Sequence, residues 1–302
     1  MSAYLRAFGR YVPERVVANA ELAARLDRTA EWIENASGIR ERRYAAADED
    51  VVSMAVRAGL DCLQRAGVEP GSVGLLIVAS GSGTSGFPGP AVSVAHALGL
   101  GSTPALDVPV ASAGSVFALA LAMRLTEAHG KVLVIASEKM SVLIGDDPNT
   151  AMLFGDGAGA VLVSTEPGGL RLVDAVLHSD GAYRDDLAFD GSLRMNGLNV
   201  ILHASRKMPA VIDEVLQRNQ MTAAQVGTFL LHQANLNLLT RVAKSVNVDR
   251  ERVFTNIERY GNTSSASMLI AASEWAETNP VDGPVVFCAF GAGFHWGAVL
   301  AV

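Results

Sequence analysis

The residues with the clearest chemical potential lie in a run of small side chains, Asp107-Val108-Pro109-Val110-Ala111-Ser112-Ala113-Gly114. A β-rich segment leads into this run, and an apolar helical pattern over about residues 115–124 follows it. We therefore expect Ser112 at the N-terminus of a buried helix, where unpaired N–H groups and the helix dipole favour negative charge. Such a position suits a nucleophile that carries an acyl group. Taken alone, a serine at such a place is more often a helix cap or a packing contact.

Two further segments carry polar side chains that suit the same chemistry. His232 ends an apolar strand-like run in Leu230-Leu231-His232-Gln233-Ala234-Asn235. Asn262 lies in a Gly/Ser-rich turn that opens a helix, Tyr260-Gly261-Asn262-Thr263-Ser264-Ser265-Ala266. A histidine N–H and an asparagine amide can both donate hydrogen bonds to a developing enolate oxygen. Singly, His232 is more often a satisfied core histidine, and Asn262 a turn or cap residue.

Together, these segments resemble the β-ketoacyl-acyl-carrier-protein synthase III family. In that family the motifs His-Gln-Ala-Asn and Gly-Asn-Thr-Ser bear the catalytic His and Asn, and both motifs are intact here. Other family-like segments extend over nearly the full chain, at residues 31–33, 38–43, 154–160, 177–181 and 290–297. The resemblance implies that an acyl group is held covalently while a second substrate loses CO2 and becomes a carbanion.

The resemblance also implies a set of site residues. Ser112, His232 and Asn262 would be catalytic, and the backbone N–H groups of Ser112 and Ala292 would form an oxyanion hole. The implied substrate-binding residues are Trp32, which stacks on the adenine of coenzyme A in the family, Phe87, which would line the acyl pocket of a dimer partner, and His295. His295 replaces a small hydroxyl residue that is common in its motif, and we expect no metal at the site.

One departure from the family pattern concerns the nucleophile itself, because Ser112 stands where the family has cysteine. A hydroxyl has a pKa far above that of a thiol, so a helix dipole alone cannot ionise it. His232 would then have to act as a general base, as in serine hydrolases. An oxyester is also a poorer acyl donor than a thioester, which should slow condensation. The serine is either natural, as in some relatives from secondary metabolism, or an engineered Cys→Ser change made to trap a substrate.

Three other departures lie at positions that contact substrates or partners in the family. Ala36 stands where members that bind coenzyme A usually carry Arg. Asn237 replaces a basic residue that meets the acidic carrier protein, and Ala292 crowds a Gly triplet. Trp32 is retained. These changes indicate a chain that has diverged from housekeeping fatty-acid synthesis.

The elements that must position these residues alternate between strands and helices. β-branched runs predict strands, and 3.6-residue periodicity predicts helices. We expect strands at residues 73–79, 131–136, 158–163 and 285–290, and helices at 51–65, 115–124, 205–217, 236–245 and 264–277. Asn19 is a candidate N-cap of a first helix that ends near Leu26.

A faint internal repeat indicates two similar halves. Residues 155–163 are echoed by 291–302, and each segment follows an apolar strand and a helix that opens with small residues. Chance similarity within an α/β chain can also produce such an echo. The thiolase-like fold that the resemblance implies is a duplication in α-β-α-β-α layers. We therefore expect an N-terminal half, 1–166, with the nucleophile, and a C-terminal half, 167–302, with the catalytic His and Asn.

Composition narrows the class of protein. Half of the 302 residues are apolar, 18% are charged and the net charge is -7, which disfavours nucleic acid as a partner. Cys62 and Cys288 lie in apolar patterns and predict neither a disulfide framework nor a metal site. The N-terminus lacks a signal-peptide pattern, and no apolar run has the length of a membrane span, so we expect a cytoplasmic protein.

The sequence therefore predicts a homodimeric acyltransferase that acts on acyl thioesters of coenzyme A or acyl carrier protein without a further cofactor. The preferred reaction is decarboxylative Claisen condensation in fatty-acid-like, polyketide or specialised metabolism. Acyl transfer to a hydroxyl or amine acceptor is the first alternative. A non-catalytic partner subunit of a heterodimeric synthase and a thioester hydrolase are the others, although intact His232 and Asn262 argue against a silent subunit.

Overall fold

The fold is built on one mixed sheet. The computed structural model describes residues 2–83, 86–145, 147–279 and 283–302. In this part of the chain nine strands follow the order β11-β12-β13-β8-β1-β7-β6-β4-β5. Their bounds are Ala3–Tyr11 (β1), Leu75–Ala79 (β4), Ala105–Val108 (β5), Lys131–Lys139 (β6), Asp156–Ser164 (β7), Leu170–Ser179 (β8), Thr228–Leu231 (β11), Val285–Gly291 (β12) and His295–Ala301 (β13).

Two strand pairs lie outside this sheet. One joins β2 (Arg15–Ala18) to β3 (Glu41–Tyr44), and the other joins β9 (Leu187–Phe189) to β10 (Leu193–Met195). Both pairs are antiparallel.

The strand order repeats itself on the two sides of the sheet. In β4-β6-β7-β1 the first two strands are parallel and the following pairs are antiparallel. The series β11-β12-β13-β8 has the same pattern. The two series meet where β1 pairs with β8 over only three positions, beginning at Ala3 and Leu172. This order suits the expected repeat, and the expected boundary at 166/167 falls in the connection between β7 and β8. The boundary itself stays a prediction.

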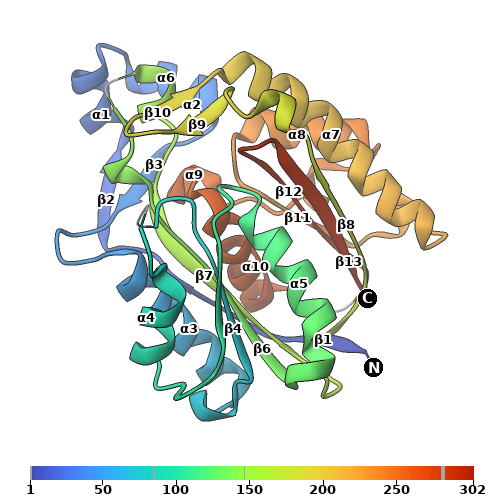
Figure 1. Cartoon of the computed structure of the whole chain (residues 1–302). Coiled ribbons are helices and arrows are strands. Elements are labelled where there is room, and N and C mark those ends of the chain that lie inside the picture. Colours follow the sequence, from blue (N-terminus) through green and yellow to red (C-terminus); the bar gives the residue numbers. More distant parts are fainter. Residues whose placement is uncertain (1, 84–85, 146, 280–282) are drawn as a thin grey trace.

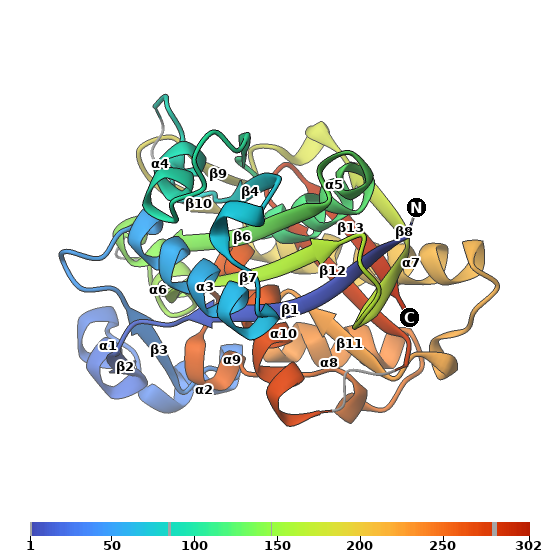
Figure 2. The same ribbon diagram turned by 90° about the horizontal axis from the view of Figure 1, so that it is seen from below.

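The helices form three layers, one between the two series of strands and one on the outer face of each series. The central layer is α5 (Gly114–His129) and α10 (Ser267–Thr278), which lie between the two series of strands (Figure 1). One outer layer is α3 (Val51–Ala66) and α4 (Pro90–Ala97), of which α3 is seen in front of β6 and β7 in Figure 2. The other is α7 (Gly197–Arg218) and α8 (Leu236–Ser245). The layers therefore run α-β-α-β-α, as the resemblance predicts.

Strands buried on both faces explain why this arrangement forms. Along β4, Ile77 faces the central helices, whereas Leu76 and Val78 pack under the outer layer. Along β12, Phe287 faces the central helices and Val286 faces α7 and α8. Because side chains alternate between the faces of a strand, a continuous apolar run supplies both cores at once.

Short helices complete the chain. The α-helical ones are α1 (Asn19–Leu26), α2 (Ala30–Ser37), α6 (Pro148–Ala151) and α9 (Ile257–Tyr260). The 3-10 turns are Pro70–Ser72, Met140–Val142, Gly181–Tyr183, Ala223–Gln225, Arg250–Arg252 and Ser264–Ala266. No helix in the described residues has the length and apolar character needed to cross a membrane.

Every expected element is present, with differences at helix ends. The helix expected over 115–124 continues to His129 and ends at Gly130, which takes a positive φ. The helix expected from residue 205 begins at Gly197, where the Asn196 side chain caps it. Its first turns lack a buried apolar face, since Leu198 is exposed, so the apolar periodicity does not reveal them. The segment expected as one helix over 264–277 is a 3-10 turn followed by α10.

The N-cap prediction for Asn19 is wrong. Ala18 occupies the N-cap position of α1 and makes no side-chain cap. The Asn19 amide instead donates to the Ile39 carbonyl at 2.6 Å and accepts from the Arg42 guanidinium at 2.7 Å. Arg42 is fully buried, so its need for an acceptor outweighs the local capping role of Asn19.

Candidate active site

Ser112 lies in a tight turn between β5 and α5. Its φ is +63°, a left-handed conformation that few non-glycine residues adopt, and it is 7% exposed. The turn is closed by the Ala113 N–H, which donates to the Ala111 carbonyl at 2.8 Å. Helix α5 begins two residues later without a side-chain cap. Ser112 therefore lies beside unpaired N–H groups at a helix N-terminus, as expected.

The backbone segments that pack against this turn leave no room for a side chain, so they carry glycine at the points of contact. A Cβ added to Gly291 would lie 2.1 Å from the Ala111 carbonyl oxygen and 2.9 Å from the Ser112 Cβ. A Cβ added to Gly81 would lie 2.5 Å from the Ala111 Cβ. The ends of β4 and β12, from opposite series of strands, thus meet at the candidate nucleophile.

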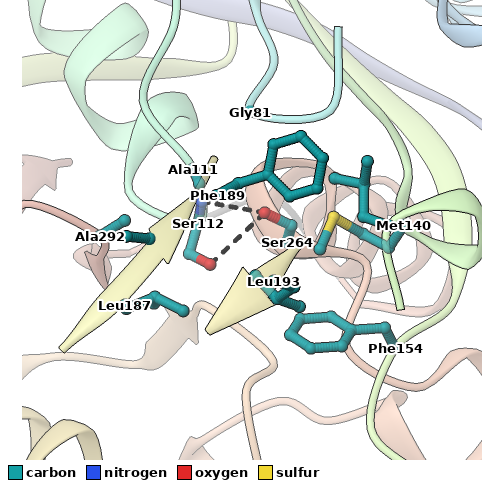
Figure 3. A pocket seen from close by; sticks show the side chains of 12 residues that line it. Gly81, Ala111, Ser112, Met140, Phe154, Leu187, Phe189, Leu193, Ser264 and Ala292 are labelled. Carbon is teal, nitrogen blue, oxygen red and sulfur yellow. Dashed lines mark hydrogen bonds between the residues drawn. The ribbon is translucent and has the colours of Figure 1, made fainter. Parts of the chain in front are cut away.

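Ser264 is the immediate polar neighbour of Ser112. The Ser112 N–H donates to the Ser264 Oγ at 3.0 Å, and the two hydroxyl oxygens are 3.4 Å apart (Figure 3). Ser264 is buried and also has a positive φ of 48°. The N–H predicted to serve the oxyanion hole is thus engaged by a hydroxyl, which an incoming oxyanion would have to replace or share.

His232 follows directly from the end of β11. Its N–H donates to the Cys288 carbonyl at 2.8 Å, which continues the ladder with β12. The ring Nδ1 lies 2.6 Å from the Ser267 Oγ at the start of α10. The side chain is buried, and this burial lowers the pKa of His232 to about 4. The imidazole is therefore neutral near pH 7.

Asn262 connects the histidine segment to the nucleophile. Its backbone is fixed by a bond from its N–H to the Leu153 carbonyl at 2.8 Å. Its side-chain Oδ1 accepts from the Ser264 N–H at 2.9 Å, and its Nδ2 donates to the Ala234 carbonyl at 3.5 Å. One chain of contacts thus runs from Ser112 through Ser264 and Asn262 to the His-Gln-Ala-Asn segment.

A mostly apolar cavity opens in front of Ser112. Its volume is about 50 Å³. The hydroxyls of Ser112 and Ser264 form its polar end, with Ala292 beside them, and the aromatic rings of Phe154 and Phe189 line the rest with aliphatic side chains (Figure 3). The remaining lining residues are Gly81, Ala111, Met140, Leu143, Leu187, Ala188 and Leu193. A hydroxyl at the end of an apolar cavity can hold the carbonyl carbon of an apolar acyl group.

The three implied substrate-binding residues lie outside this cavity lining. Trp32, on α2, is half-buried, and the Arg28 guanidinium covers its ring at 5.3 Å from the centroid. His295, at the start of β13, bonds the Ser179 Oγ through Nδ1 at 2.7 Å and packs edge-on against the Phe117 ring. Their roles remain predictions.

Phe87 is 99% exposed on this single chain. It lies in the loop between β4 and α4, of which Thr84 and Ser85 fall outside the described residues. Its expected place in a partner's acyl pocket also remains a prediction.

Two of the departures from the family pattern are neighbours in space. The Asn237 amide donates to the carbonyls of Asn35 and Ala36, at 3.1 and 3.3 Å, and the Asn235 amide donates to Ala36 at 3.0 Å. These bonds satisfy carbonyls at the C-terminal end of α2, which a helix leaves without partners. Asn237 thus joins α8 to α2.

Residues that the sequence analysis did not single out surround the same site. Glu138, fully buried at the end of β6, accepts from the N–H groups of Gly81 and Ser82 at 3.0 and 2.8 Å, and from Ser265 at 3.3 Å. Ser264 and Ser265 belong to the segment that carries Asn262, and Ser267 follows it, but each also has a partner that is distant in sequence. No local signal distinguishes them from other small turn residues. Among the described residues no cluster of His, Cys, Asp or Glu could hold a metal ion.

The layered fold is that of thiolase-like condensing enzymes, a class of acyltransferase. The solved structures that resemble it support this class. The 3-oxoacyl-[acyl-carrier-protein] synthase III from Aquifex aeolicus superposes with a TM-score of 0.96 at 33% identity, covering 99% of each chain. The priming β-ketosynthase from the R1128 polyketide biosynthetic pathway gives a TM-score of 0.93 at 31% identity, covering 99% of this chain and 96% of that one.

Sequence comparison gives the family. Residues 106–181 match the family model for 3-oxoacyl-[acyl-carrier-protein (ACP)] synthase III, and residues 216–302 match the model for its C-terminal part. The β-ketoacyl-[acyl-carrier-protein] synthase III of Oleidesulfovibrio alaskensis is 36% identical, with 98% of both chains covered. The chain belongs to the 3-oxoacyl-[acyl-carrier-protein] synthase III family, so the predicted fold class and enzyme class are confirmed.

Proposed function

We propose that the protein transfers an acyl group from a thioester of coenzyme A or acyl carrier protein to Ser112 and uses this ester in a decarboxylative Claisen condensation. The placement of Ser112 supports this most directly. Its hydroxyl lies at the N-terminus of α5 and at the polar end of an apolar cavity, joined through Ser264 to Asn262. A helix N-terminus favours the negative charge that develops during acyl transfer, and the apolar lining suits the chain of an acyl group.

Loading would form one bond and break another. The Ser112 Oγ attacks the thioester carbonyl, its proton passes to the departing sulfur, and the C–S bond gives way to a C–O bond. The negative charge that develops on the carbonyl oxygen needs donors, for which the backbone N–H groups of Ser112 and Ala292 are the candidates.

Condensation would then use the neutral donors of the other half. A malonyl-type thioester loses CO2, and the electron pair of the broken C–C bond forms an enolate. Donation from His232 and the Asn262 amide lowers the energy of that enolate. Its carbon attacks the ester on Ser112, a new C–C bond forms, and the serine oxygen leaves and regains a proton.

His232 has two candidate roles that need opposite states of Nε2. To accept the Ser112 proton during loading, Nε2 must be bare. To donate to the enolate oxygen, Nε2 must carry the ring proton. The low pKa of about 4 keeps the ring neutral, so only one of the two nitrogens is protonated at a time.

The serine itself favours a second candidate function, plain acyl transfer to a hydroxyl or amine acceptor. An oxyester is less reactive towards a carbanion than a thioester, and transfer without decarboxylation does not need the Asn262 amide. The intact pairing of His232 with Asn262 supports condensation instead, since a simple transferase gains nothing from a second set of donors.

One experiment separates these functions. Intact-protein mass after incubation with acyl thioesters reports loading, and radiolabelled CO2 release from a malonyl thioester reports decarboxylation. We expect Ser112→Ala to abolish loading. We expect Asn262→Ala to load normally but to release CO2 roughly 10²–10³-fold more slowly. Loading of Ser112→Ala would refute the nucleophile, and absence of CO2 release from the unmodified protein would select the transferase.

The origin of the serine is tested by Ser112→Cys. If the serine replaces a natural cysteine, this variant should condense faster, because a thiolate is the better nucleophile and a thioester the better donor. If the serine is natural, we expect little gain, because the pocket is then adapted to an oxyester.

We also propose that the chain forms a homodimer through the face around β5. This strand is an edge of the described sheet, and the exposed apolar side chains Phe87, Val92 and Leu106 lie on or beside it. A surface groove lined by the loop between β4 and α4 shares Gly81, Leu143 and Phe189 with the cavity in front of Ser112. A partner seated there would therefore reach the cavity wall.

A further inference from the structure

The surroundings of the His232 ring bear on which nitrogen carries its proton. Among the described residues, the His232 ring makes one hydrogen bond, between Nδ1 and the Ser267 Oγ at 2.6 Å, and Nε2 bonds no described residue. The backbone on both sides of the ring is fixed, because the His232 N–H bonds the Cys288 carbonyl and the Gln233 N–H bonds the Ser267 Oγ at 3.0 Å. The ring edge at Nδ1 is thus held against the start of α10.

The hydrogen bonds of Ser267 indicate the direction of its bond to the ring. A backbone N–H can only donate, so the Ser267 Oγ accepts from Gln233. The hydroxyl proton of Ser267 then needs an acceptor, since both Ser267 and His232 are buried. Within the described chain, His232 Nδ1 is the acceptor that lies in reach. The opposite direction would leave this buried hydroxyl proton without a partner.

We infer that the Ser267 hydroxyl donates to His232 Nδ1 and thereby holds the single imidazole proton on Nε2. The assignment of the proton does not depend on the proposed function, but its role in catalysis does. A neutral ring with its proton on Nε2 is a hydrogen-bond donor, so Ser267 is a positioning residue that prepares His232 for the enolate rather than for removal of the Ser112 proton. Base catalysis of loading by His232 would require this bond to reverse.

The tautomer can be measured without any activity. In protein with 15N-labelled histidine, protonated and bare ring nitrogens have well-separated chemical shifts, and the signals of His232 are assigned by their loss in His232→Gln. We expect the unmodified protein near pH 7 to carry the proton on Nε2. A proton on Nδ1 would overturn the inference, whatever the enzyme proves to catalyse.

Variants at Ser267 test its part in this. In Ser267→Ala we expect the Nε2–H form to lose its dominance. CO2 release should fall about 10²-fold while loading of Ser112 stays within a few-fold. Ser267→Thr restores the hydroxyl and should restore both the tautomer and CO2 release. Ser273→Ala is the matched control, because Ser273 is also a fully buried serine of α10 but bonds Arg10 instead.

Each outcome has a distinct meaning. An unchanged tautomer and unchanged CO2 release in Ser267→Ala would refute the role of Ser267. A loss of loading equal to the loss of CO2 release would show that His232 acts first as a base, which also contradicts the inference. If the unmodified protein loads Ser112 but releases no CO2, the proposed condensation fails, and the tautomer measurement still decides the inference.

Discussion

At the scale of single residues, the site combines a nucleophile that is difficult to ionise with a histidine that is difficult to protonate. Ser112 relies on a helix N-terminus and on its neighbour Ser264. His232 is buried beside an apolar strand end, and desolvation alone depresses its pKa. Within the described part of the chain the ring of His232 bonds Ser267 and no carboxylate, whereas a buried aspartate orients the histidine of a serine hydrolase.

The depressed pKa of His232 predicts a pH dependence of stability. Its folded value of about 4 lies below the unfolded value near 6.5, so between these values the unfolded chain binds the additional proton. The contribution of His232 to the free energy of unfolding is therefore present above pH 6.5 and is lost as the pH falls towards 4. Between pH 7.5 and pH 5 this one group should remove about 2 kcal/mol.

Urea unfolding at the two pH values checks this, with His232→Gln as the reference because it cannot titrate. The other ionisable groups are common to both proteins, so the difference between their pH dependences isolates His232. We expect the unmodified protein to lose more stability on acidification. Equal losses in the two proteins would contradict a buried, neutral histidine.

At the scale of elements, the nucleophile is positioned by strand ends that approach one another from the two series of the sheet. Gly291, at the end of β12, lies against the turn before α5, with no room for a Cβ beside the Ala111 carbonyl. The turn therefore cannot relax without moving β12. The strained φ of Ser112 is held by this packing.

Gly291→Ala should displace the Ser112 turn while the fold persists. The added methyl group would lie 2.1 Å from the Ala111 oxygen, so either strand or turn must shift. We expect a loss of about 1–3 kcal/mol in stability and a fall in acyl loading on the order of 10²-fold. Thermal unfolding and intact-protein mass measure the two. Gly71→Ala, where an added Cβ meets nothing within 4 Å, is the control, and a loading defect in it as well would remove the argument.

The same scale shows what sequence could predict. Apolar runs buried on both faces predicted the strands well. The family motifs indicated Ser112 and Asn262, which the structure links through Ser264, and His232, whose segment Asn262 contacts at the Ala234 carbonyl. The bond between Ser267 and His232 joins two elements that are 35 residues apart, and nothing local to either residue encodes it. The wrong N-cap prediction for Asn19 has the same cause, because the buried Arg42 of β3, 23 residues further along the chain, donates to the Asn19 side chain.

At the scale of the whole molecule, the face around the edge strand β5 exposes apolar side chains to solvent. The edge strand β5, helix α4 and the loop after residue 86 expose apolar side chains together, and Phe87 is almost entirely in solvent. Edge strands with exposed apolar residues are sites of pairing with another chain. The adjoining groove leads to the acyl cavity, so assembly and catalysis should depend on the same loop.

Phe87→Ser tests this dependence. Light scattering at micromolar concentration should give the unmodified protein a mass of twice the 31.6 kDa chain, and the variant a larger monomer fraction. Acyl loading of the variant should fall with the dimer fraction, because a partner's aromatic ring would no longer close the cavity wall. Leu60→Ser is the control, since Leu60 is 46% exposed on the outer helix α3, away from the β5 edge. A monomeric unmodified protein with full loading would refute the interface, and a dimeric variant with normal loading would show that Phe87 is not part of it.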